Sequence, residues 1–280
     1  MGNSYAWQVQ YRQEFISAFE QRQSLLRSAV TVDSVIKGQQ ATFLVAGSNS
    51  ATAVTRGLNG LIPARNDDLT QYTATLAEWH DLVQRTGFNV FGSQGDARRI
   101  MQETTMGVIN RKIDQDILTE MANATNDAGS VATLSLSKVM HAWTILGNND
   151  VPVEEDDNMF FVISPAAYAY LMQTKEFASA DYVDVKPFVG PARRYRRWAG
   201  FNWIVHPNIS GAGTAAEYLY AFHRKAFGHA VNTADIQSPV GYHEEQDYSW
   251  ARCSVYMGSK LLQNSGIVKV THDGSAFAAT

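Results

Sequence analysis

Cysteine is almost absent from this sequence, because Cys253 is the only one among 280 residues. A single cysteine cannot form a disulfide within the chain, and such a composition is typical of proteins that fold in a reducing compartment. Cys253 lies in a strand-like run and has no CxxC partner. We therefore interpret it as a small, half-buried structural residue and not as a nucleophile.

Long hydrophobic runs are also missing. No segment approaches the roughly 20 consecutive apolar residues that a membrane-spanning helix requires. The N-terminus lacks the basic region followed by an apolar core that defines a secretory signal. The expectation is a soluble protein made in the cytoplasm, with no membrane partner.

Positive charge is scarce, with 23 lysines and arginines against 27 aspartates and glutamates and a net charge of -4. A protein that coats DNA usually carries a strong positive field, so this class is disfavoured. One local exception lies between two aromatic residues, where four arginines cluster: Arg193, Arg194, Arg196 and Arg197.

The familiar motifs of catalysis and cofactor binding do not occur. The sequence has no GxxxxGK[ST], GxGxxG, GxSxG or HExxH motif. The acidic run Glu154–Asp157 is contiguous, and such runs are more often solvated loops than calcium sites. His223 and His229 flank a basic turn, and His243–Glu245 would alternate between the two faces of a strand. The sequence therefore predicts no enzyme and no catalytic, cofactor-binding or metal-binding residues.

Apolar residues nevertheless make up 45% of the chain, which is enough for one large domain or two modest ones. Near the N-terminus, Trp7, Tyr11 and Phe15 fall four residues apart and predict a helix over residues 5–28. The polar side of this segment is rich in glutamine and poor in charge. We expect an amphipathic arm that lies on its own domain or on a neighbouring copy.

A long hairpin follows the arm. Residues 41–45 and 72–83 both have strand patterns, and the segment between them is long, small and polar. Two long strands with so weak a core do not form a stable unit alone. The hairpin is therefore expected to project and to lie on another surface.

The strongest helical pattern covers residues 96–124, where Ile109, Ile113 and Ile117 repeat at the helical period. Asp114 and Asp116 are expected on its polar side, spaced for pairs with Arg111 and Lys112.

The rest of the chain alternates before returning to long strands. Helices are expected to begin after Ser135 and at Ser164–Pro165. Strands are expected at residues 159–163, 201–205, 217–222, 240–247, 248–257 and 266–270.

This order of elements resembles the Hong Kong 97-type fold of major capsid proteins of tailed double-stranded DNA bacteriophages. Six segments resemble those of short-tailed phage capsid proteins in residues as well as in order: Gly38–Gly47, Thr73–Leu76, Asp114–Ala122, Phe161–Leu171, Gly200–Pro207 and Phe222–Gly228. The order they share is more specific than any one of them.

The resemblance implies an α+β fold with five named parts. These are an N-terminal arm (N-arm) over residues 1–36, an E-loop hairpin with flanking P-domain strands over 37–90, the spine helix of the P-domain over 91–130, an α/β A-domain over 131–234, and P-domain return strands over 235–280.

The resemblance also implies a function. The chain would be a structural protein that self-assembles into pentamers and hexamers of an icosahedral shell around phage double-stranded DNA. Its implied partners are many copies of itself, a separate scaffolding protein, a portal protein at one vertex, and packaged DNA bound without sequence specificity. It would be assembled in the host bacterial cytoplasm and reside in the virion.

Two other classes remain open at this point. An encapsulin-type shell around enzyme cargo shares this fold, and a soluble α+β enzyme would need a deep pocket that the sequence does not indicate.

The resemblance suggests residues for contacts between subunits. A-domains crowd around the five-fold and six-fold axes, so the four clustered arginines would lie near subunit boundaries and pair with carboxylates. Coating a solvated turn and contacting packaged DNA are the alternatives. Further candidates come from the E-loop and the arm: Arg56, Arg65, Trp7, Tyr11 and Phe15.

Some family members join their subunits covalently through an E-loop lysine. No lysine occurs here between Lys37 and Lys112. Arginine cannot perform that chemistry, so the expected shell has no isopeptide crosslinks.

Overall fold

The computed structural model describes residues 23–35, 37–48, 51–65, 68–92, 97–175 and 196–277. They divide into two compact units, which are described separately. The first is built from Trp79–Arg111 and Ile236–Val255. The second is built from Ser24–Glu78, Lys112–Asp235 and Tyr256–Thr280. Three elements continue along the chain from one unit into the other: β4 (Ala77–Thr86), α2 (Ala97–Met121) and β11 (Tyr248–Leu261).

In the first unit, β10 (Val240–His243) pairs with the start of β11 in antiparallel register, and β4 also pairs with β11. The short helix α1 (Gly87–Gly92) follows β4. Along β11, Ala251, Cys253 and Val255 are buried at every second position, as expected for the covered face of a strand, and Ser254 between them is buried as well.

The second unit contains a five-stranded sheet in the order β12-β8-β5-β7-β6. Its strands are β12 (Ile267–His272), β8 (Glu217–His223), β5 (Met159–Ile163), β7 (Phe201–Val205) and β6 (Arg196–Trp198). All five residues of the central strand β5 are buried, and β5 runs parallel to β7 and antiparallel to β8. This continuous apolar run is typical of a strand covered on both faces.

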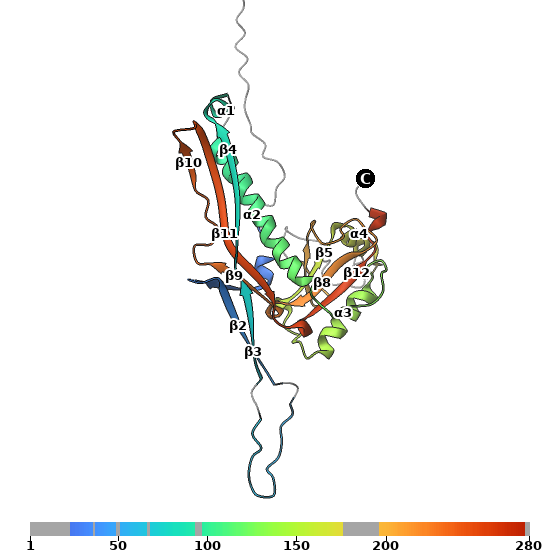
Figure 1. The fold of residues 1–280 in the computed structure, drawn as a ribbon. Helices are drawn as coiled ribbons and strands as arrows, with labels where there is room; N and C mark the ends of the chain where they lie inside the picture. Colours follow the sequence, from blue (N-terminus) through green and yellow to red (C-terminus); the bar gives the residue numbers. More distant parts are fainter. Residues whose placement is uncertain are drawn as a thin grey trace, which may run out of the picture. The chain divides into compact units, whose positions relative to one another are not determined.

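Two helices belong to this sheet. The helix α3 (Leu136–Asn148) contacts β12 and β8, as Figure 1 shows. The helix α4 (Pro165–Gln173) begins immediately after β5. The Ser164 hydroxyl accepts a hydrogen bond from the Ala167 amide, and Pro165 occupies the first turn, where its missing N–H costs nothing.

A second group of strands lies in the same unit. β1 (Thr31–Val35) runs parallel to β9 (Phe227–Asn232), and β9 pairs with the final residues of β11 in antiparallel register. β2 (Gln40–Gly47) and β3 (Asp68–Thr75) pair only with each other among the described strands. Short 3-10 turns complete the structure at Arg27–Ala29, Asp156–Asn158, Arg224–Ala226, Asn264–Gly266 and Ser275–Phe277.

The base of the β2–β3 hairpin has a small hydrophobic cluster. Ala41 and Ala74 are buried in it with Ala230 of β9, and three partly buried side chains pack against them: Val35, Phe43 and Leu76. A Cβ added to Gly258 of β11 would lie 2.1 Å from the carbonyl oxygen of Thr75. The hairpin backbone therefore lies directly against the strand, which only glycine permits.

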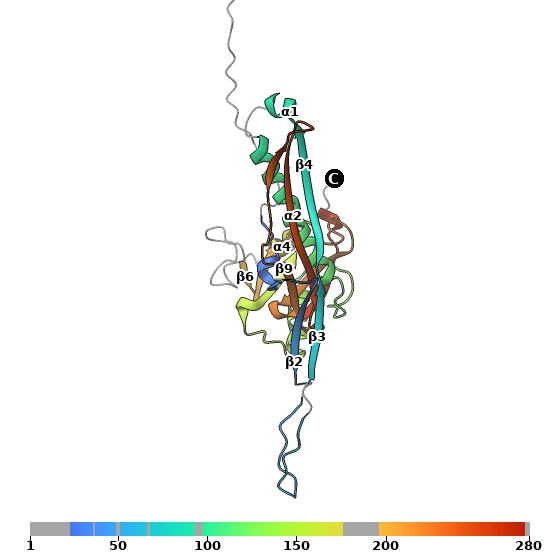
Figure 2. The same ribbon diagram turned by 60° about the vertical axis from the view of Figure 1, so that its left-hand side comes forward.

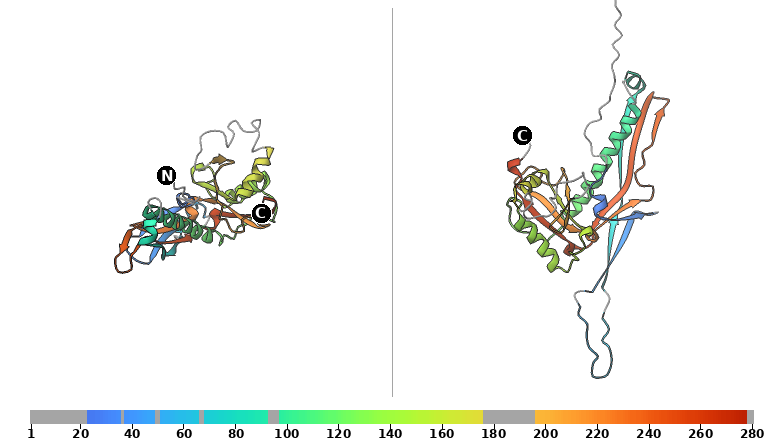
Figure 3. Two further views of the ribbon diagram at one scale, coloured as in Figure 1. Left: turned by 90° about the horizontal axis from the view of Figure 1, so that it is seen from above. Right: turned by 180° about the vertical axis from the view of Figure 1, so that it is seen from behind.

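The remainder of the hairpin has no core of its own. Residues 51–65 continue beyond the ends of β2 and β3 as a loop, visible in Figure 2 and in the right-hand view of Figure 3. Every residue from 51 to 65 is exposed. The exposed set includes four large apolar side chains: Val54, Leu58, Leu61 and Ile62.

Most of the expected elements in the described residues are present, and the differences concern residues 72–83, the end of the N-terminal segment and Asp114. The single strand predicted over residues 72–83 is two strands, because Leu76 leaves the ladder and donates its amide to the Gln39 carbonyl. The helix expected over 5–28 lies mostly outside the described residues, and Arg27–Ala29 forms only a 3-10 turn. Asp114, expected on the polar face of α2, has no accessible surface.

The close approach at Gly258 predicts a steric effect on stability. Gly258→Ala should lower the free energy of unfolding by roughly 1–3 kcal/mol, because the new methyl group meets backbone atoms of Thr75. Gly147→Ala is the matched control, since its Cβ would meet nothing within 4 Å and the site lies in α3. That control should stabilise the protein by up to about 1 kcal/mol. Calorimetry of the unassembled protein measures both, and equal transition temperatures would contradict the packing argument.

Candidate assembly interface

The hairpin loop of residues 51–65 is the first candidate surface. Leu58, Leu61 and Ile62 are 108%, 74% and 66% exposed, so this apolar area is not covered by the described chain. Arg56 and Arg65, both selected from the sequence, lie in the same loop and are also exposed. The loop therefore combines apolar side chains with two cations, which suits a surface that binds another protein.

The clustered arginines are only partly described. Arg193 and Arg194 lie outside the described residues, as do Trp7, Tyr11 and Phe15.

Arg196 lies in β6, where its backbone is paired with that of Trp203 in β7. Of the four clustered arginines, Arg197 is the one whose side-chain contacts are described. It forms an ion pair with Asp157, and its Nε donates to Oδ1 of Asn202 at 3.2 Å.

Arg197 thus takes part in a set of contacts that connects β6 and β7 to the loop before β5 within one chain. Asn202 is buried, and its side-chain amide donates to the carbonyls of Asp156 at 2.5 Å and Met159 at 3.0 Å. These contacts fix the loop that precedes β5. Arg197 and Asp157 are still 61% and 79% exposed, so the same pair is accessible to a second molecule.

Two residues of the acidic run Glu154–Asp157, namely Glu155 and Asp157, make side-chain contacts within the chain. Asn158 donates to Glu155 at 2.7 Å, which together with weaker contributions lowers the pKa of that carboxyl. Nε2 of His223 lies 3.6 Å from Glu155. Within the described ranges, no group of three or more potential ligands is arranged to hold a metal ion.

The carboxylates of α2 bind segments that are distant in the sequence. Asp116 accepts a hydrogen bond from the Ser259 hydroxyl of β11 at 2.6 Å, and Nδ1 of His229 lies 2.9 Å from the same hydroxyl oxygen. Because Ser259 donates to Asp116, Nδ1 of His229 is the donor to Ser259. Glu120 accepts from the Leu261 amide at 3.3 Å.

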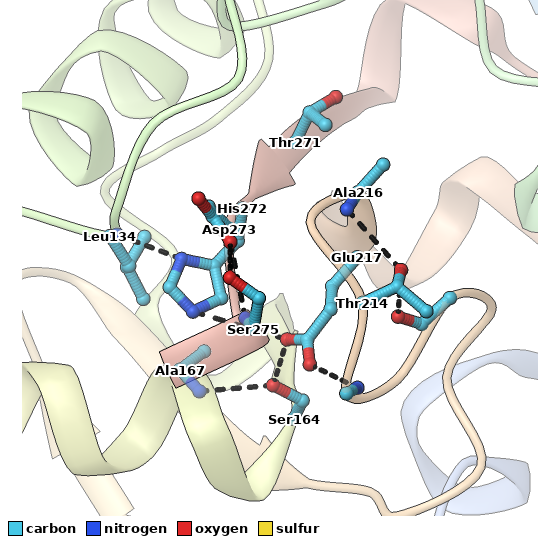
Figure 4. A network of polar contacts seen from close by, with 12 residues as sticks. Leu134, Ser164, Ala167, Thr214, Ala216, Glu217, Thr271, His272, Asp273 and Ser275 are labelled. Carbon is cyan, nitrogen blue, oxygen red and sulfur yellow. Dashed lines mark hydrogen bonds and ion pairs between the residues drawn. The ribbon is translucent and has the colours of Figure 1, made fainter. Parts of the chain in front are cut away.

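Glu217, the first residue of β8, is fully buried and binds segments at the end of the five-stranded sheet where β5 ends (Figure 4). Glu217 accepts from the Ser164 hydroxyl and, at 2.6 Å, from the Gly213 amide. Nε2 of His272 lies 3.9 Å from the same carboxylate. Gly274 passes so close that a Cβ there would lie 2.2 Å from Oε1 of Glu217.

Serine, glutamate and histidine can form a catalytic triad, but this arrangement differs from one. Nδ1 of His272 accepts the Leu134 amide at 2.9 Å, so a neutral ring carries its proton on Nε2 and cannot accept one there. The Ser164 hydroxyl donates to Glu217 instead of to the imidazole. All three side chains are buried. The network holds the loop before β8 against the start of α4.

Two further residues from the sequence analysis, His243 and Cys253, are packed against other parts of the chain. His243 stacks on Tyr248 with ring centroids 5.1 Å apart. Cys253 is fully buried, not half-buried as expected, and burial with the nearby charge of Asp81 raises the pKa of its thiol to about 11. A thiol with that pKa is not a nucleophile at neutral pH.

The sequence interpretation missed Asp114 and Glu217. Asp114 follows Asn110 by four residues and precedes Ile117 by three, so it falls on the wide buried face of α2. That spacing is visible in the sequence. No comparable signal marks Glu217, which occupies the first position of β8.

The sequence matches the family model described as phage capsid protein over residues 4–274, and the chain belongs to that family. Solved structures show the same fold. The capsid structure of the cyanophage P-SCSP1u aligns with a TM-score of 0.70 at 12% identity, covering 95% of this chain and 93% of that one. A chain from Mycobacterium phage Che8 gives 0.72 at 12% identity, covering 96% and 98%. The capsid of Ralstonia phage GP4 gives 0.62 at 13% identity, covering 98% of each chain. A search of curated proteins found no match.

These findings confirm the α+β capsid fold and the structural role that the resemblance implied. The protein is a structural major capsid protein, many copies of which build the phage capsid, and it resides in the virion. An encapsulin-type shell is not favoured. None of the helices in the described part of the chain is both long and apolar enough to cross a membrane.

The buried His229 predicts a specific pH dependence of stability. Burial, with Arg27 acting in the same direction, lowers the pKa of His229 to about 4. An unfolded histidine titrates near pH 6.5, so between about 6.5 and 4 the unfolded chain binds a proton that the folded chain does not. The free energy of unfolding should therefore fall by roughly 3 kcal/mol as the pH decreases through this window.

The variant His229→Asn isolates this effect. It keeps a donor near the position of Nδ1 facing Ser259 but cannot titrate. Other buried histidines are common to both proteins, so the difference between their pH profiles reports His229. Chemical denaturation from pH 7.5 to 4 should give a shallower loss for the variant, and parallel profiles would show that His229 does not contribute.

Proposed function

We propose that this chain assembles into pentamers and hexamers of an icosahedral shell that encloses double-stranded DNA. The observation that carries the proposal is the hairpin of β2 and β3, whose loop exposes Leu58, Leu61 and Ile62. In this proposal the loop lies on a neighbouring subunit. Burial of apolar surface contributes about 25 cal/mol per Å², or roughly 1.5–3 kcal/mol for each large aliphatic side chain.

The proposal assigns roles to the parts of the chain with the boundaries expected from the sequence: arm 1–36, E-loop 37–90, spine helix 91–130, A-domain 131–234 and return strands 235–280. The arm residues Trp7, Tyr11 and Phe15 would contact neighbouring copies, as would Arg56 and Arg65 of the hairpin loop. The role would be structural throughout, without a catalytic step.

The other partners follow from the same proposal. A separate scaffolding protein would guide assembly, and a portal protein would occupy one vertex. The excess of carboxylates in the chain suits an enclosed DNA that must be packed and released, because a strongly basic inner surface would hold it. DNA contact would be without sequence specificity.

The clustered arginines would act between A-domains. Planar guanidinium groups pair with carboxylates in a bidentate manner, which suits contacts between identical subunits. Arg197 already pairs with Asp157 in its own chain, and both side chains remain largely exposed. We propose that Arg193, Arg194, Arg196 and Arg197 contribute to the subunit boundary around the symmetry axes.

The hairpin loop gives the first test. Leu58→Gln, Leu61→Gln and Ile62→Gln combined should reduce the particle yield at least tenfold, since each side chain would lose its burial on a neighbour. The stability of the unassembled chain should change little, because all three side chains are exposed in it. Electron microscopy and sedimentation measure the yield.

A control variant, Val131→Gln, changes an apolar side chain that is 53% exposed elsewhere in the same unit. It should leave particle formation intact. Normal particles from the triple variant would mean that the loop is not an assembly contact.

Charge reversal tests the arginines. Arg196→Glu with Arg197→Glu should block particle formation and leave the unassembled chain folded, because an exposed ion pair contributes only about 0–1 kcal/mol. The exchange variant Arg197→Asp with Asp157→Arg restores opposite charges within the chain. If particles return in the exchange variant, the pair acts inside the subunit and the boundary role of Arg197 is wrong.

A further inference from the structure

The residues that begin the described chain converge on one buried carboxylate. Asp114 of α2 has no accessible surface and accepts the Ser24 hydroxyl. It also accepts the amide of Leu25 at 3.0 Å and that of Leu26 at 3.2 Å. We call Ser24, Leu25 and Leu26 the arm root, because they join the N-terminal arm to the second unit.

A fourth donor comes from the other side of Asp114. Nε2 of His206 lies 3.1 Å from Oδ2 of Asp114, and Nδ1 of the same ring accepts the Asn208 amide at 3.1 Å. The accepted hydrogen bond at Nδ1 places the ring proton on Nε2, so His206 donates to Asp114. His206 directly follows β7, and its own amide donates to the Ile163 carbonyl at 2.8 Å.

The four donors found among the described residues suit a carboxylate, which offers four lone-pair positions. Burial alone would raise the pKa of Asp114, but the bonds from His206, Ser24 and Leu25 outweigh it and the pKa is lowered. The charged form is therefore the one that the arm root and His206 stabilise. A buried charge is tolerated only when it is bonded in this way.

The chain after the arm root is held as well. Arg27 pairs with Asp235 at 2.9 Å, and Arg224 donates to the Ser28 carbonyl at 3.0 Å. Leu26 and Ala29 are fully buried. The segment then continues into β1, which pairs with β9. Within the part of the chain that the structure describes, the contacts of Asp114 lie at the N-terminal end of this held segment.

We propose that Asp114 is a positioning residue for shell assembly, which fixes the point and direction at which the N-terminal arm leaves the subunit. Ordering flexible segments opposes association, so an arm whose root is already ordered binds a neighbour more tightly. This inference rests on the proposed role of the arm in contacts between subunits. Asp114 itself is fully buried within the subunit.

Aspartate is suited to this position, whereas asparagine is not. Each of the four partners donates a hydrogen. An asparagine would turn its amide hydrogens towards at least one donor and leave it unpaired. Asp114→Asn therefore preserves size and removes the anchor.

Hydrogen exchange of the unassembled protein reports the anchor directly. In Asp114→Asn the amides of Leu25 and Leu26 should exchange at least tenfold faster, while the amides of β5 keep their protection. Asp116→Asn is the matched control on the same helix, because Asp116 bonds Ser259 and not the arm root. A purely structural role would accelerate exchange throughout the second unit and lower its melting temperature. Unchanged exchange at Leu25 and Leu26 would overturn the inference.

Particle formation tests the link to assembly. Asp114→Asn should lower the particle yield at least tenfold, and the milder Ser24→Ala should lower it less, since it removes one of the four bonds. If Asp114→Asn does not fold, Ser24→Ala provides the test. Faster hydrogen exchange of the Leu25 and Leu26 amides together with a lower particle yield supports the inference. A normal exchange rate or a normal particle yield overturns it.

Deleting residues 1–22 separates the two proposals. Normal particles from this truncated chain would overturn the role of the arm, and the positioning role of Asp114 with it. Failed assembly of the truncated chain together with normal assembly of Asp114→Asn would overturn the positioning role alone.

Discussion

A hairpin of two strands cannot bury its own apolar side chains, and this constraint governs how the chain works. At its base, β2 and β3 gain burial from a small cluster of three alanines, against which three larger side chains that are only partly buried pack: Val35, Phe43 and Leu76. Gly258 brings the hairpin backbone against β11. Beyond the base, Leu58 and the other apolar residues of the loop are exposed. The folded chain thus leaves part of its hydrophobic free energy available for association, as a protein that builds a shell from many copies requires.

Extended segments can direct association only if the body that carries them is well defined. In the second unit this definition comes from buried carboxylates as well as from apolar packing. Asp114 joins the arm root, α2 and the residue after β7, while Glu217 joins the start of α4 to the loop before β8. Each carboxylate would cost several kcal/mol if a donor were missing, so alternative arrangements of these segments are disfavoured. Their contribution is to the uniqueness of the structure as much as to its stability.

The sequence allowed the elements to be predicted where their signals are local. The apolar run of β5, the Ser164–Pro165 start of α4 and the periodic isoleucines of α2 all depend on neighbours within a few residues, and all were confirmed. The break at Leu76 and the burial of Asp114 were not predicted. Leu76 leaves the strand and donates to the carbonyl of Gln39, the residue before β2, and Asp114 is bound by residues about 90 positions away. The helical spacing of α2 could have placed Asp114 on the buried face, but no periodicity within a helix or strand identifies the distant partners of Asp114 or of Leu76.

The Arg197 pair shows why the surface was harder to interpret than the core. Charge and aromatic neighbours indicated a binding residue, but the nearest carboxylate proved to be Asp157 of the same chain. An exposed pair gains little free energy, so it can exchange partners at small cost when another subunit approaches. Weak, exchangeable contacts let a misplaced subunit dissociate, and many of them together make a closed shell stable. A surface that assembles reversibly should therefore contain exposed pairs such as Arg197 and Asp157, and the fully buried bonds should lie inside the subunit.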